Sequence, residues 1–254
     1  MAIFVKMKIP IRHRTEGVGR RFEIEKHMRK FVILIGLVVM HLSAVAQQSI
    51  HSRKMDAFRT IDLAGNLHVE LIRSDTIGVD ILLNNTTIER LQWGVKDGVL
   101  SIYLKPGGQS EANGEVTLYY QDFDNLKISQ SSVVACDTLN RLMLDVQLQA
   151  GATFSGTMDV KDLNLKVTGN SAAHLSGVVK YLTLGASGKS KVDARRLEAI
   201  DASVSAASTA EVYVWSQERL QVSAESGGAV YYKGAPEIFR SSTKMMGTVN
   251  NIGQ

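Results

Sequence analysis

Six side chains with chemically useful groups recur along the C-terminal half at intervals of 18 to 20 residues. Three in succession, Ser155, His174 and Asp193, are the residue types of a nucleophilic triad. His174, Asp193 and Glu211 are types that bind divalent metals. On strands stacked about 4.8 Å apart, Asp193 and Glu211 would approach the carboxylate spacing of a retaining glycosidase. The full set is Asp137, Ser155, His174, Asp193, Glu211 and Tyr231.

A solvated strand face explains the same set more simply, because the outward positions of a half-buried strand are polar. Side chains in one stacked column project in parallel, whereas the members of a triad must converge. The sequence also lacks a P-loop, a GxSxG motif and a paired CxxC. We therefore predict no catalytic residue, no cofactor and no metal site. Ser155, His174, Asp193 and Glu211 remain the candidates to locate in the structure.

The spacing of these residues follows from a repeat that extends from Leu126 to the C-terminus. Segments of alternating apolar and polar residues start at steps of 18, 19, 19, 18, 20 and 18 residues. A fixed period of this length is typical of stacked coils, each of which buries its inner face against its neighbours. The segments are LKISQSS from 126, LDVQLQA from 144, LNLKVTG from 163, LTLGASG from 182, IDASVSA from 200, LQVSAES from 220 and a less regular IFRSSTK from 238.

In the first six segments the first, third and fifth residues are apolar, with Gln130 as the exception. The residues between them are polar or glycine, and this period of two predicts strands with one buried face. The seventh residue is always Gly, Ala or Ser, which indicates a tight corner between coils. We therefore predict an all-β fold, in which residues 126–254 form a single-stranded, right-handed parallel β-helix.

Residues 50–125 also alternate, but without a fixed period. Turn signals such as Ala64-Gly65-Asn66 and Lys96-Asp97-Gly98 separate their apolar stretches. We expect antiparallel strands or early coils that cap the N-terminal end of the β-helix, because an uncovered end exposes strand edges. Residues 50–254 would then form one continuous domain.

The N-terminus is typical of an exported protein. Met28-Arg29-Lys30 precedes the apolar run Phe31 to Met40, and Ala44-Val45-Ala46 fits a cleavage site. The run has ten residues, about half of what a membrane span requires. We predict a cleaved signal peptide over 28–46 and no membrane span after cleavage. Residues 1–27 are interpreted as an extension upstream of a start at Met28, or as an unusually long basic leader.

Charge and cysteine usage exclude further classes. The net charge of +4 depends on the leader, because residues 1–46 hold nine of 29 basic and three of 25 acidic residues. The remaining 20 basic and 22 acidic residues give a net charge of −2. Nucleic-acid binding needs a basic surface, so we exclude it. The single cysteine, Cys136, rules out an intrachain disulfide and is interpreted as a buried apolar side chain.

Four short sequence segments, in their order along the chain, resemble those of a known family. They are Phe58-Arg59-Thr60-Ile61, Asn66-Leu67-His68-Val69, Asp97-Gly98-Val99-Leu100-Ser101-Ile102 and Val230-Tyr231-Tyr232-Lys233-Gly234-Ala235-Pro236. With the small corners, they resemble the head GIN domain family, labelled auto-transporter adhesins and common among exported proteins of Bacteroidetes-type bacteria. The resemblance covers roughly residues 55–250 and implies a secreted β-helical surface or periplasmic protein. It implies no site residue.

Three functions fit these observations, and we favour the first. It is an exported, non-enzymatic module, adhesin-like, that contacts an envelope protein or glycan through its rigid outer face in the periplasm, on the outer-membrane surface or outside the cell. The second is a carbohydrate-binding or carbohydrate-active protein of pectin-lyase-like shape, with Tyr119-Tyr120, Trp215 and Tyr231-Tyr232 as sugar-stacking candidates. The third is an envelope scaffold that self-assembles, as a homo-oligomer, through its terminal coils.

Overall fold

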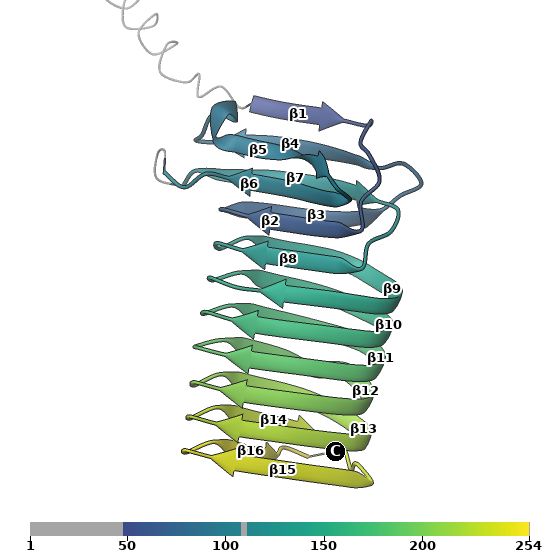
Figure 1. Cartoon of the computed structure of the whole chain (residues 1–254), viewed down its shortest axis with the longest axis vertical. Coiled ribbons are helices and arrows are strands. Elements are labelled where there is room, and N and C mark those ends of the chain that lie inside the picture. Colours follow the sequence, from purple (N-terminus) through teal and green to yellow (C-terminus); the bar gives the residue numbers. More distant parts are fainter. Residues whose placement is uncertain (1–47, 108–110, 254) are drawn as a thin grey trace, which may run out of the picture. The chain divides into compact units, whose positions relative to one another are not determined.

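The computed structural model describes residues 48–107 and 111–253, and apart from one short 3-10 turn their regular structure is entirely β (Figure 1). The all-β prediction is therefore confirmed. The expected signal peptide over 28–46 and the extension over 1–27 lie outside the described residues. The 3-10 turn is η1 (Ile88–Arg90).

Five long parallel strands form the regular part of the β-helix. Each runs along one sheet, bends and continues along the opposite sheet, so that one strand and one corner complete a coil (Figure 1). Leu144, Leu163 and Leu182 are paired in register on successive coils and are at most 2% exposed. The predicted stacking of leucine over leucine is confirmed. The strands are β9 (Val133–Leu148), β10 (Thr153–Thr168), β11 (Ala172–Ser187), β12 (Lys191–Ala207) and β13 (Glu211–Glu225).

The register of the other predicted segments needs correction, because bends and corners absorb extra residues that the alternation does not count. The first and fifth segments were aligned two residues away from their structural partners, and the seventh was aligned one residue away. Gln130, the polar exception, thereby leaves the inner row and lies in a corner with a φ of 55°. The structural pairs are Leu126 with Val146, Leu182 with Ala202, and Leu220 with Phe239.

The corners use left-handed backbone at two successive residues in most coils, for example Ala150 with Gly151 and Ser208 with Thr209. This conformation favours glycine and small polar residues, since a Cβ crowds the following carbonyl. Stacking adds a second constraint, because a Cβ on Gly169 would lie only 3.2 Å from the backbone nitrogen of Ala150. The predicted small residues at the corners are thus explained by conformation as well as by close approach.

The N-terminal half forms both antiparallel strands and coils, as expected, but its coils do not follow chain order. β2 pairs in parallel with both β6 and β8, and β3 pairs in parallel with both β7 and β9. The coil of β2 and β3 therefore lies between the later coil of β6 and β7 and the first regular coil (Figure 1). The strands are β2 (Thr60–Ala64), β3 (Leu67–Arg73), β6 (Val99–Leu104), β7 (Asn113–Tyr120) and β8 (Asn125–Ser129).

The two ends of the coil stack differ. At the N-terminal end β1 (Gln48–Ser52) and β4 (Gly78–Asn84) extend one sheet with antiparallel pairs, and β5 (Leu91–Lys96) extends the other. At the C-terminal end β14 (Ala229–Lys233), β15 (Ile238–Lys244) and β16 (Thr248–Asn251) continue the parallel stacking. The N-terminal half thus caps one end, as predicted.

Candidate functional site on the outer surface

The structure brings three of the four candidate residues into one column. Ser155 pairs with His174, and His174 pairs with Asp193. The next residue in the column is Tyr213, so the predicted neighbour Glu211 is displaced by two residues and pairs with Lys191. The predicted adjacency of Asp193 and Glu211 is therefore wrong. The cause is a coil of 20 residues from Asp193 to Tyr213, where 18 had been assumed.

Of the other two members of the predicted row, Asp137 leaves the column and Tyr231 stays in it. Ala135, not Asp137, pairs with Ser155, because the first segment pairs two residues away from its predicted alignment. Asp137 falls at the irregularity in the pairing of β9 with β10. Tyr231 does belong to the column, since it pairs with Tyr213. The observed column is Ala135, Ser155, His174, Asp193, Tyr213, Tyr231 and Asn250.

Asp193 is held by an ion pair with its neighbour Arg195. The Arg195 Nε donates to the Asp193 carboxylate at 2.9 Å, and this hydrogen bond lowers the pKa of Asp193 to about 2. The Arg195 guanidinium also lies 4.9 Å from the ring centroid of Tyr213. Within the described part of the chain no hydrogen bond joins Ser155 or His174 to another member of the column. The arrangement lacks the connected hydrogen bonds that activate a nucleophile.

The tyrosines continue the column as a stack. Tyr213 and Tyr231 have ring centroids 4.8 Å apart at an interplanar angle of 15°. Beside them, the Lys233 Nζ lies 4.0 Å above the ring of Trp215. Since the rings cover one another and carry cations, each has fewer free faces against which a sugar ring could stack. In the N-terminal half, Tyr120 is buried and the Arg53 guanidinium lies 4.6 Å from the Tyr119 ring.

Within residues 48–107 and 111–253, no three His, Cys, Asp or Glu side chains are grouped so that they could hold a metal ion. Burial raises the pKa of the Cys136 thiol to about 12. The thiolate, which is the reactive form of cysteine, is therefore not populated near neutral pH.

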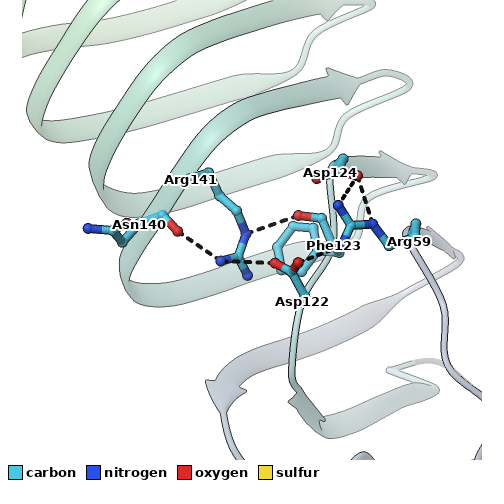
Figure 2. Close-up of polar contacts among 6 residues, drawn as sticks. All are labelled: Arg59, Asp122, Phe123, Asp124, Asn140 and Arg141. Carbon is cyan, nitrogen blue, oxygen red and sulfur yellow. Dashed lines mark hydrogen bonds and ion pairs between the residues drawn. The ribbon is translucent and has the colours of Figure 1, made fainter.

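The densest polar cluster of the N-terminal half fixes the loop that joins β7 to β8. This loop passes the intervening coil of β2 and β3, and Figure 2 shows arginines on either side of it. The Arg59 Nε donates to Asp124 at 2.8 Å, and Arg59 also pairs with Asp122. Phe123, between the two aspartates, is fully buried and contacts Tyr120 edge to face with centroids 4.9 Å apart.

Arg141 on β9 completes this cluster from the other side (Figure 2). Its side chain is only 8% exposed and pairs with Asp122 at 3.1 Å. It donates to the backbone carbonyls of Phe123 at 3.0 Å and Asn140 at 2.8 Å. The contacts with Asp122 and Phe123 tie the crossing loop to the stack, so we assign the cluster a structural role. No sequence pattern indicates this cluster, because its members are far apart in the chain.

A shallow groove of about 470 Å³ crosses the bend of β9 to β13. Leu142, which is 77% exposed, and Val178, which is 50% exposed, line it together with Lys161 and Lys180. Met143 and Tyr181, each next in sequence to a lining residue, are also exposed. No sequence pattern indicates this surface, because it lies between the alternating segments that form the repeat.

The fold and its surface define a parallel β-helix with a capped N-terminal end and without a convergent cluster of reactive groups in the described residues. The family model described as "Putative auto-transporter adhesin, head GIN domain" matches residues 57–236. The chain therefore belongs to the head GIN domain family, which confirms the resemblance found in the sequence.

Solved structures support the same fold. A putative adhesin from Bacteroides fragilis is 18% identical, with a TM-score of 0.75 over 82% of this chain and 98% of its own. A putative lipid binding protein from Parabacteroides distasonis is 16% identical, with a TM-score of 0.64 over 82% and 98%. A putative adhesin from Parabacteroides merdae is 14% identical, with a TM-score of 0.64 over 82% and 97%. No curated protein matches the chain.

No helix within 48–107 or 111–253 has the length and apolarity to cross a bilayer.

Proposed function

We propose that this adhesin-like β-helix is exported and acts as a non-enzymatic contact module that binds an envelope protein or glycan. The observation that carries the proposal is the bend groove, where Leu142 and Val178 are exposed among polar groups, with the exposed Met143 and Tyr181 next to lining residues in the sequence. Exposed apolar groups gathered in one place on a soluble protein are typical of interaction surfaces. Membership of the adhesin-labelled family supports the same reading.

The charge of the groove favours a neutral or mixed partner. Lys161 and Lys180 stand beside Asp159 and Glu198, so neither sign dominates. A partner with apolar groups rimmed by polar ones, such as a protein or a glycan, complements this surface better than a polyanion does. Rigid strands on both sides fix the positions of the lining side chains before binding. Little ordering of the groove is then needed when a partner arrives.

Export is tested by expressing the full chain with its leader in a Bacteroidetes host and sequencing the N-terminus of the product. We expect cleavage after Ala46, with Gln47 first, and protein in the envelope or medium. An intact Met1 on protein confined to the cytoplasm would contradict export.

Binding to an envelope protein or glycan is tested with protein-coated beads. Their adhesion to envelope preparations of the producing bacterium and to purified glycans is measured. The double variant Leu142→Glu with Val178→Glu should lower saturable adhesion about tenfold, since buried apolar contacts carry most interface energy. The matched control is Thr183→Glu with Ser223→Glu, two exposed positions that do not line the groove and do not pair with each other. Equal loss in both variants, no adhesion by the unmodified protein, or release of sugar from a polysaccharide would contradict the proposal.

A further inference from the structure

The C-terminal coil leaves a sheet edge uncovered. β15 pairs with β13 and β16 pairs with β14, and no other described strand covers their outer edges. All seven residues of β15 are exposed. Five of the eleven exposed large apolar side chains belong to this last coil, which shows that apolar surface is concentrated there: Ile238, Phe239, Met245, Met246 and Ile252. Such an edge is a template for pairing with another strand.

The last corner is the least polar of the series. Met245 and Met246 adopt left-handed backbone with φ of 47° and 65° and are 76% and 88% exposed. The corresponding corners of inner coils carry small or polar residues such as Ala150 with Gly151. Both are large apolar side chains in a conformation that disfavours them, and within a single chain most of their surface remains in water. A covering surface would remove them from water.

The N-terminal end of another copy does not match this edge. Its outermost strands run in opposite senses, since β1 lies antiparallel to β4, which is antiparallel to β7, while β5 lies antiparallel to β6. The last coil instead presents β15 and β16 in the common direction of the coils. Head-to-tail addition would therefore pair one sheet in parallel and the other antiparallel. The same coil, turned by a two-fold axis, pairs both sheets antiparallel.

We propose that two copies associate tail to tail about a two-fold axis, with β15 pairing antiparallel with β15 of the partner subunit. The closed symmetry produces a dimer and not a filament. The inference is independent of the bend groove and adds a second binding surface to the proposed function. Two outward-pointing modules on one rigid body would increase the avidity of contact.

The sequence of β15 selects one register. Directly opposite residues must point to the same face, so a residue pairs with one whose number has the same parity. Full overlap places Ser241 opposite Ser241 of the partner subunit, and Arg240 opposite Ser242 of the partner subunit. A shift by two residues in one direction places Arg240 opposite Lys244 of the partner subunit, which is unfavourable. A shift in the other direction places Arg240 opposite Arg240 of the partner subunit, and both shifts shorten the overlap.

This register gives a charge test at positions that face outward. Sedimentation equilibrium of the purified full chain should show a monomer–dimer equilibrium. Ser242→Arg places two arginines opposite each other twice in the dimer and should weaken dimerisation about tenfold. Ser242→Glu should strengthen it by a similar factor, and Arg240→Glu combined with Ser242→Arg should restore it. Ser203→Arg, an exposed residue of an inner coil, is the control that should change nothing.

Three results would overturn the inference. They are a protein that stays monomeric at the highest attainable concentration, dimerisation that Ser242→Arg does not weaken, and filaments that grow with concentration. None of these results bears on bead adhesion through the bend groove, which a monomer can still show. The two proposals therefore fail separately.

Discussion

Both halves of the domain contain stacked coils, but the order of the coils and the contacts that hold them differ. From β9 onward, each coil lies on the one that precedes it in the chain, and leucines such as Leu144 and Leu163 stack directly. Before β9 the coils are out of order, and the loop around Phe123 must pass one coil to reach the next position. The regular half is held by repeated apolar contacts. The crossing is held by one buried ring and a cluster of arginines and aspartates.

This β-helix therefore needs sequence repetition only where its coils follow chain order. A repeat supplies each coil with a matching neighbour, so stability is roughly a sum of similar nearest-neighbour terms. At the crossing the neighbours are not consecutive, and specific contacts replace the repeat. Arg59 and Arg141, from two different coils, hold Asp122 between them. We expect perturbations there to separate the two halves, and perturbations of a regular coil to weaken the stack locally.

The largest expected effect comes from Phe123→Ala. Phe123 is fully buried against Tyr120 and beneath Arg141, and removing a buried aromatic ring costs about 4 kcal/mol. Because the ring anchors the crossing loop, chemical denaturation should show an early transition of the N-terminal half before the coils unfold. Phe123→Leu, which keeps most of the volume, is the control. A single transition with an unchanged midpoint would show that Phe123 does not stabilise the crossing loop.

Leu163→Ala is the matching change in a regular coil. Leu163 is 2% exposed and contacts its counterparts Leu144 and Leu182, so the cavity should cost about 3 kcal/mol in the free energy of unfolding. The loss should appear in the main transition, without an early phase. Lys166→Ala on the outer face of the same strand should stay within about 0.5 kcal/mol. An early phase in Leu163→Ala would abolish the distinction between the halves.

Arg141→Ala tests the polar side of the crossing. The change removes hydrogen bonds to the carbonyls of Phe123 and Asn140 and uncovers two rings, at an expected cost of about 2 kcal/mol. Arg141→Lys should recover only part of this, because lysine lacks the planar group. The solvent-exposed Arg59 serves as comparison, and Arg59→Ala should cost less than about 1 kcal/mol. Equal costs at both positions would show that burial of Arg141 is immaterial.

The smallest expected effect is the pH dependence due to Asp193. Its pKa is lowered to about 2 by Arg195, so the ionised carboxylate is favoured in the folded state. The stabilisation is present above the unfolded-state pKa of about 4 and is lost as the pH falls toward 2. Asp193→Asn should therefore cost about 1 kcal/mol at pH 6 and almost nothing at pH 2, as followed by denaturation at both values. A cost independent of pH would contradict the ion pair.

Much of the regular half could be predicted from the sequence, because alternation of period two with corners every 18 to 20 residues is a local signal. The stacking of Leu144 with Leu163 follows from it directly. The position of Glu211 could not be predicted, since extra residues enter at bends where no alternation marks them. The order of the N-terminal coils could not be predicted either, because the apolar face of β2 could pack equally well beside β6 or β8. Only contacts between distant residues such as Arg59 and Asp124 decide it.

The most direct test of the crossing is a pair of engineered disulfides. The structure places Asp62 opposite both Lys127 and Ser101, on its two neighbouring strands. Asp62→Cys with Lys127→Cys should form a disulfide under mild oxidation, since paired Cα atoms lie within bridging distance. Ser101→Cys with Lys127→Cys should not, because the coil of β2 lies between them. The opposite outcome, a disulfide only between positions 101 and 127, would mean that the coils follow chain order and that the described arrangement is wrong.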